Sequence, residues 1–176
     1  IFYKWSKAEK EAIGLYEVVT DSTNRKDEKW YINTNESFTF ANNTVTRSWG
    51  TATAKAHADT LWTQQDSDDG DLPDDKEVGD VKVEGLKTQL IRTIKQQAAG
   101  ILQNTDWYIV RKADAGTAVP SAITTHRAAV RTKAAEMETA ITNASDTPAL
   151  ETLYTYTEQE DGSITRPLGE LPTLES

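Results

Sequence analysis

Few side chains in this 176-residue sequence are of the types that carry catalysis. The chain has no cysteine, so it offers no thiolate nucleophile, thiolate metal site or disulfide. Its two histidines, His57 and His126, fall in separate predicted helices and have no nucleophile motif beside them. We interpret both as polar side chains on helix surfaces. The nine glycines are too scattered for a phosphate-cradling loop. We therefore expect a protein that is not an enzyme and that uses no cofactor.

The densest group of charged side chains is acidic. Eight acidic residues and one lysine lie between Asp66 and Asp80. A calcium-binding EF-hand loop needs oxygen ligands at its first, third and fifth positions, glycine at the sixth and glutamate at the twelfth. With Gly70 sixth, Gln65 would be first and Lys76 last, so the spacing fails at both ends. We predict a solvated linker over residues 64–81 and no metal site, with weak calcium binding by residues 66–80 left open.

Two arginines are candidates for binding a partner. Arg127 and Arg131 stand one turn apart on a predicted helix, where they could clamp a carboxylate. The alternative is that they are solvated or that they pair with a local acid, such as Asp106 or Asp114.

A tryptophan and the C-terminal tail supply further candidates. Trp107 follows a predicted helix and could be a core residue or a contact residue. Residues 157–176 contain Gly169 and two prolines, so we expect an extended tail that a neighbouring chain holds in place. The candidate partner-binding residues are Trp107, Arg127, Arg131, Arg166 and Leu168.

The elements that would position these side chains begin with a β-rich module over residues 1–63. Ser6 and Glu9 have the spacing of a capping box, which predicts a short helix that ends near Gly14. The segments 15–19 and 29–32 have the β-branched and aromatic composition of strands.

A hairpin is the clearest local prediction. Alternating residues flank Asn42-Asn43, a pair that tolerates the left-handed turn conformation. A two-residue turn pairs Phe40 with Val45 and Phe38 with Arg47, which predicts a half-buried face carrying Phe38, Phe40, Val45 and Trp49. The spacing of apolar residues over 53–62 predicts a short helix that packs back on this sheet.

Residues 82–156 have helical periodicity. One stripe contains Val83, Leu86, Leu90, Ile94, Ala98 and Ile101. After a loop with Gly116 and Pro120, a second helix begins at Ser121 with Ile123, Val130, Met137 and Ile141 on its inner face. A third begins at Thr147, whose hydroxyl would cap it ahead of Pro148. The fold class is thus α+β, a small antiparallel β module followed by a helical hairpin module and an extended C-terminal tail.

Bulk composition limits the partners. The net charge is −9 and the pI about 4.7, which disfavours nucleic acid and an anionic membrane surface. No apolar run approaches the roughly 20 residues that span a bilayer. The first residues lack the layout of a signal peptide, and the lack of cysteine fits synthesis in a reducing cytoplasm. A polar composition with 37% hydrophobic residues predicts a thin core that partner contacts or oligomerisation would complete.

Several segments resemble phage proteins. Three segments resemble phage tail assembly chaperones: the run 101–107, which ends in Thr-Asp-Trp, the loop with Pro120, and the run 126–131 (His-Arg-Ala-Ala-Val-Arg). The runs 14–19 and 29–32 with the Asn42 hairpin are similar to the small β module of tail-fibre-related proteins, including those of marine phages. The resemblance covers residues 12–156. His126 stands where tyrosine is usual and Val130 where leucine is usual.

The resemblance implies protein–protein work at a phage tail. We expect a structural virion protein that contacts other tail, fibre or baseplate proteins, made in the host cytoplasm and present as a homo-oligomer or within a larger assembly. The first alternative is a transient tail or fibre assembly chaperone that is absent from the mature particle. The second is a receptor- or carbohydrate-binding module, because the N-terminal sheet is rich in aromatic residues.

Overall fold

The computed structural model describes residues 2–174, and they form an α+β fold. The chain divides into two compact units, 1–55 and 56–176. The boundary falls before residue 63, the predicted end of the β module, because the segment from residue 56 onward pairs with a later part of the chain.

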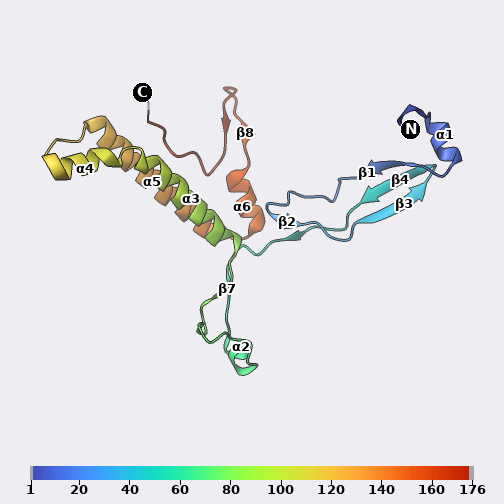
Figure 1. Ribbon diagram of the computed structural model, residues 1–176, viewed down its shortest axis with the longest axis horizontal. Helices are drawn as coiled ribbons and strands as arrows, with labels where there is room; N and C mark the ends of the chain where they lie inside the picture. Colours follow the sequence, from blue (N-terminus) through green and yellow to red (C-terminus); the bar gives the residue numbers. More distant parts are fainter. Residues whose placement is uncertain (1, 175–176) are drawn as a thin grey trace. The chain divides into compact units, whose positions relative to one another are not determined.

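The first unit combines a short helix with five strands (Figure 1). Ser6 and Glu9 form the predicted capping box, and Gly14 adopts a left-handed φ of 80° just after the helix. The elements are η1 (Phe2–Lys4), α1 (Lys7–Ala12), β1 (Glu17–Thr20), β2 (Tyr31–Ile32), β3 (Ser37–Ala41), β4 (Thr44–Ser48) and β5 (Thr53–Ala54).

The predicted hairpin is confirmed in turn and register. Asn42 and Asn43 have φ of 50° and 55°, and Phe40 pairs with Val45 and Phe38 with Arg47. Strand β1 adds to the other side of β4, so the sheet order is β1-β4-β3. The pairing of β1 with β4 is parallel, which makes this sheet mixed rather than wholly antiparallel.

The predicted helix over residues 53–62 is wrong, because this segment is extended. Its first part, β5, pairs with β2 through Tyr31 and Ala54, and the amide of Lys55 donates to the carbonyl of Trp30 at 2.9 Å. Trp30 and Tyr31 are 3% and 4% exposed. They are the only buried side chains among residues 3–55, so the core of the first unit is small.

The second unit begins with a hairpin built around the acidic segment. Strand β6 (Thr60–Leu61) pairs antiparallel with β7 (Val81–Val83), and the short helix α2 (Gln64–Asp68) lies between them. Thr63 and Asp66 form a capping box at the start of α2. The acidic segment, predicted as a linker, is thus the connection of a paired hairpin.

The start of α3 (Leu86–Gln103) is held by the residues that precede β6. The amides of Leu86 and Lys87 donate to the carbonyls of Ala56 and His57, each at 3.0 Å. The carboxylate of Asp59 accepts from the amide of Gly85 at 2.7 Å. These bonds satisfy amides that a helix start leaves without partners. A Cβ at Gly85 would lie 2.3 Å from the backbone of Ala58, so the close approach requires glycine.

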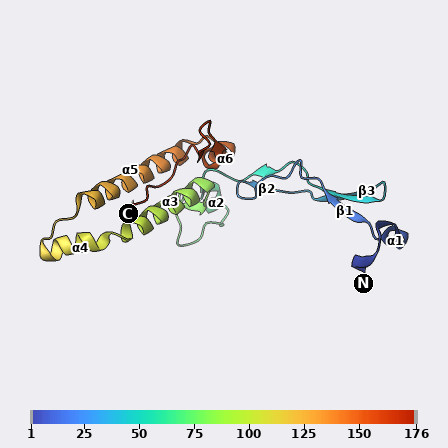
Figure 2. The ribbon, with the colours of Figure 1, turned by 90° about the horizontal axis from the view of Figure 1, so that it is seen from above.

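Two long helices form the core of the second unit. Helices α3 and α5 (Ser121–Asn143) run antiparallel, with α4 (Asp106–Ala115) at one end (Figures 1 and 2). Val83 lies in β7 and is exposed, which corrects the first position of the predicted stripe. Ile101, at the other end of the stripe, is only half-buried. The remaining predicted core residues are buried: Leu86, Leu90, Ile94, Ala98, Ile123, Val130, Met137 and Ile141.

Helix α6 (Thr147–Tyr154) and the tail complete this unit. The cap of α6 is Asp146, whose side chain accepts from the amide of Ala149, rather than Thr147 as predicted. The tail forms a small hairpin of β8 (Thr157–Glu158) and β9 (Ile164–Thr165). It then returns to its own helices, where Leu168 is 2% exposed and its amide donates to the carbonyl of Leu153 at 3.0 Å. The expectation that a neighbouring chain holds the tail is therefore corrected.

Candidate protein-interaction surfaces

Arg127 joins three parts of the helical unit and is buried. Its guanidinium donates to the carbonyl of Leu102 and to the hydroxyl of Thr105, both at 2.7 Å, and pairs with Asp106 at 2.8 Å. It is only 7% exposed. Of the two alternatives from the sequence, the structure shows the local pairing with Asp106, so Arg127 connects α5 to the junction of α3 and α4 rather than facing a partner.

The neighbouring polar side chains on α5 have different surroundings. Arg131 is exposed, which leaves it accessible to a partner. His126 is 8% exposed, so the interpretation of this histidine as a surface side chain is corrected. His57 is half-buried and lies in an extended segment rather than on a helix.

The two candidate residues of the tail contact their own unit. Leu168 is buried in the core of that unit, so its prediction as a partner-binding residue is corrected. Arg166 donates a hydrogen bond to one carboxylate oxygen of Glu170 and forms an ion pair with the other, each at 2.8 Å. Its guanidinium lies 5.1 Å from the ring centre of Tyr154. The hydroxyl of Tyr156 donates to Glu170 at 2.5 Å, and this hydrogen bond raises the pKa of the phenol. Arg166 thus orders the tail.

Helix α4 carries the candidate Trp107 on an exposed surface. None of its side chains is buried, and Trp107 is 51% exposed and Val110 65%. The ring of Trp107 lies 3.8 Å from that of Tyr108, and the guanidinium of Arg111 lies 4.7 Å from the Trp107 ring centre. This end of the helical unit therefore presents aromatic and aliphatic surface that the described residues of the same unit do not cover.

A second exposed surface lies on the three-stranded sheet of the first unit. Side chains alternate along each strand, so the register places Tyr16, Val18, Phe38 and Phe40 on one side, which we call the aromatic face. Their exposed fractions are 37%, 54%, 60% and 57%, and the rings of Tyr16 and Phe40 lie 4.5 Å apart. The sequence predicted a half-buried face with Phe38, Phe40, Val45 and Trp49. Val45 and Trp49 are half-buried as predicted, whereas Phe38 and Phe40 are exposed. The two phenylalanines are exposed because residues 53–62 do not form the predicted helix over the sheet, and no other described element of the first unit buries them.

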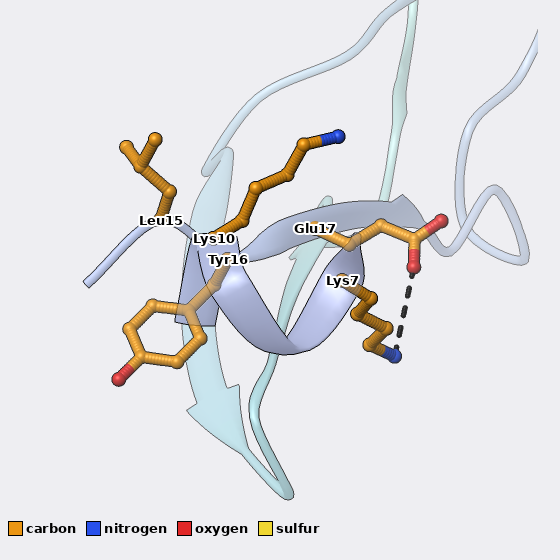
Figure 3. A pocket seen from close by; sticks show the side chains of 5 residues that line it. All are labelled: Lys7, Lys10, Leu15, Tyr16 and Glu17. Carbon is orange, nitrogen blue, oxygen red and sulfur yellow. Dashed lines mark ion pairs between the residues drawn. The ribbon is translucent and has the colours of Figure 1, made fainter. Parts of the chain in front are cut away.

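A hollow of about 380 Å³ lies beside this face, between α1 and β1 (Figure 3). It is lined by Lys7, Lys10, Leu15, Tyr16 and Glu17. Lys7 pairs with Glu17 at 3.8 Å, whereas the other side chains diverge in Figure 3. Diverging side chains suit contact with another protein surface better than catalysis, because catalysis needs functional groups directed at the same substrate atom.

The tryptophans bear on the hypothesis of carbohydrate binding. Trp30 is buried, whereas Trp49 and Trp62 are half-buried. The ring centre of Trp49 lies 4.7 Å from the guanidinium of Arg47, and that of Trp62 lies 4.3 Å from the ammonium of Lys82. Each of these two rings thus already contacts a cation of its own unit, whereas Trp30 alone of the three is in the core.

The acidic hairpin loop is ordered by its own contacts. Asp66 accepts hydrogen bonds from Lys82 and from the hydroxyl and amide of Thr63, and these bonds lower the pKa of its carboxyl group to about 2. Within residues 2–174 no three histidine, aspartate or glutamate side chains are arranged to hold a metal ion. Neither is any helix in that range long and apolar enough to cross a bilayer.

Comparisons with protein-family models, with curated proteins and with solved structures found no match for this chain. The structure brings Arg127 and Trp107 to the same end of the helical unit, and it places Arg166 and Leu168 in the packing of the tail. The aromatic face is the surface whose accessibility the sequence did not indicate.

Proposed function

We propose that the chain is a structural protein of a bacteriophage tail and that it binds a neighbouring tail, fibre or baseplate protein. The observation that supports this function is the exposed aromatic face. Contiguous exposed apolar surface is uncommon on isolated soluble proteins and marks sites of association. The exposed end of α4, with Trp107 and Val110, is a second contact surface.

The proposal assigns binding rather than catalysis. His57 lies in an extended segment and His126 is buried in α5, so the two imidazoles serve different elements. The hollow beside the aromatic face contains a lysine paired with a glutamate. The proposed partners are proteins, and the proposed location is the virion, which the chain joins after synthesis in the host cytoplasm.

Purified virions of the phage that encodes the chain test this function. Quantitative mass spectrometry should find the chain at a copy number similar to that of a tail, fibre or baseplate protein. Presence in infected cells with absence from mature particles would instead support the alternative, a transient assembly chaperone. A gene outside any phage genome would overturn both.

Two valines on β1 provide a matched pair of variants. Val18 lies on the aromatic face and Val19 on the opposite side, and their exposed fractions are similar, 54% and 47%. Val18→Glu should prevent incorporation into particles, because it places a charge inside the proposed contact. Val19→Glu should incorporate normally. Equal incorporation of both variants would show that this face is not the contact surface.

A further inference from the structure

Strand β3 forms an open edge of the sheet in the first unit. The sheet order is β1-β4-β3, and all residues of Ser37–Ala41 are exposed. Among the described residues no other segment forms a backbone hydrogen bond with Phe38 or Phe40. Natural proteins block such an edge with proline, lysine or a bulge, because its free N–H and C=O groups can pair with another strand. The sequence of β3, Ser-Phe-Thr-Phe-Ala, contains neither proline nor lysine.

The turn fixes which backbone groups face outward. In a two-residue hairpin turn the flanking residues, here Ala41 and Thr44, form a hydrogen-bonded pair. Bonded and non-bonded pairs alternate in an antiparallel ladder, so Thr39 also bonds to β4. The backbone groups of Phe38 and Phe40 therefore point away from β4, toward the open edge.

We propose that β3 pairs antiparallel with β3 of a second copy of the chain, about a twofold axis at Thr39. A twofold interface must be self-complementary, and β3 reads nearly the same in both directions from Thr39. In this register Phe38 lies opposite the partner's Phe40, and Thr39 lies opposite the partner's Thr39. The outward N–H and C=O groups of Phe38 then face those of the partner's Phe40. Each such pair of phenylalanines forms two N–H···O hydrogen bonds, one in each direction.

Side chains and charge agree with this register. The phenylalanines pair across the new ladder, where aromatic pairs are favourable. The twofold axis is normal to the sheet, so the aromatic faces of both copies lie on the same side and form one continuous surface. Residues 1–55 contain eight of the 19 basic residues and seven of the 28 acidic ones, so the negative charge of the chain lies in the second unit. Two copies of the first unit can therefore approach without strong repulsion.

Self-pairing goes beyond the proposed function and does not depend on it. A dimer of the purified chain would stand even if virions lacked the protein, and a tail protein could bind its partner as a monomer. The two proposals therefore fail in different experiments, one with purified protein and the other with virions.

Cysteine cross-linking of the full chain tests the register. The chain has no cysteine, so each variant carries a single thiol. Thr39 and the partner's Thr39 would form a non-bonded pair with Cα atoms about 4.5 Å apart, a separation that a disulfide can span. Ser37 would lie about 13 Å from the partner's Ser37, which is too far. Under mild oxidation Thr39→Cys should form a disulfide-linked dimer, and Ser37→Cys should form no covalent dimer. Equal yields, or no dimer with Thr39→Cys, would overturn the proposal.

A charge-swap pair tests the same contact without a thiol. The double variant Phe38→Lys with Phe40→Glu places lysine opposite glutamate at both crossings, so the dimer should persist in analytical ultracentrifugation. The double variant Phe38→Lys with Phe40→Lys removes the same rings but opposes like charges, and it should raise the dissociation constant at least about tenfold. Equal dissociation constants for two folded variants, checked by circular dichroism, would rule out this register.

Discussion

The two units use apolar side chains in opposite ways. In the helical unit Ile94, Met137 and Leu150 are at most 1% exposed, because α3, α5 and α6 cover one another. In the N-terminal sheet Phe38 and Phe40 are more than half exposed, although they are larger and more hydrophobic than many core residues. A helix or a sheet buries its apolar side only against a second layer. The first unit lacks that layer on the aromatic face, so the surface is available to another molecule.

The largest expected effect is the difference in stability lost when a buried and an exposed apolar side chain are each truncated. Ile94→Ala should lower the free energy of unfolding by about 2–5 kcal/mol, because it removes fully buried methyl groups and leaves a cavity. Phe40→Ala, at a position 57% exposed, should cost about 1 kcal/mol or less. Urea unfolding at low protein concentration, followed by circular dichroism, measures both. The comparison breaks down if Phe40→Ala costs as much as Ile94→Ala.

A smaller loss of stability is expected when Arg127, the buried arginine of the helical unit, is replaced. Arg127→Met removes the buried donor to the hydroxyl of Thr105 and the ion-pair partner of Asp106, which should cost about 1–3 kcal/mol. Arg131→Met, one turn along the same helix and exposed, should change stability by no more than about 0.5 kcal/mol. The same unfolding measurement compares the two. Similar losses would mean that Arg127 does not hold α4 in place.

The smallest effect concerns the acidic loop. The pKa of Asp66 lies at about 2, below its ordinary value of 3.8, so its contribution to loop order is present above pH 3.8 and is lost as the pH falls through about 2. A carboxyl titration by NMR should show this midpoint. Lys82→Met should move it toward 3.8, since Lys82 is the largest cause of the shift. Lys76→Met should leave it unchanged, because Lys76 pairs with Asp75.

The features that the sequence predicted are those that depend on neighbouring residues. The Asn42-Asn43 turn and the alternation on both sides of it determined the hairpin register. The spacing of Leu90, Ile94 and Ala98 determined the buried side of α3. In each case the signal lies within a few residues of the element that it specifies.

The wrong predictions depended on partners far along the chain. Residues 53–62 have apolar residues at helical spacing, but their strands pair with residues 31–32 and 81–83, which local periodicity cannot reveal. Arg127 lies between Ile123 and Val130 on the buried side of α5, and that spacing was the available signal that it is buried while Arg131 is not. The exposure of the aromatic face could not be predicted, because amphipathic alternation is the same whether or not a second layer forms.

The contacts at the start of α3 also bear on how the chain tolerates added length. Asp59 holds Gly85 across 26 positions, and β6 pairs with β7 just inside that contact, so both ends of the acidic loop are fixed. The entropy of closing a loop grows only slowly with its length, by about 0.6 kcal/mol for each doubling. An epitope inserted after Gly70, where φ is 79° and the surroundings are open, should therefore leave both units folded. The loop thus offers a position for a visible label on the chain within a larger particle.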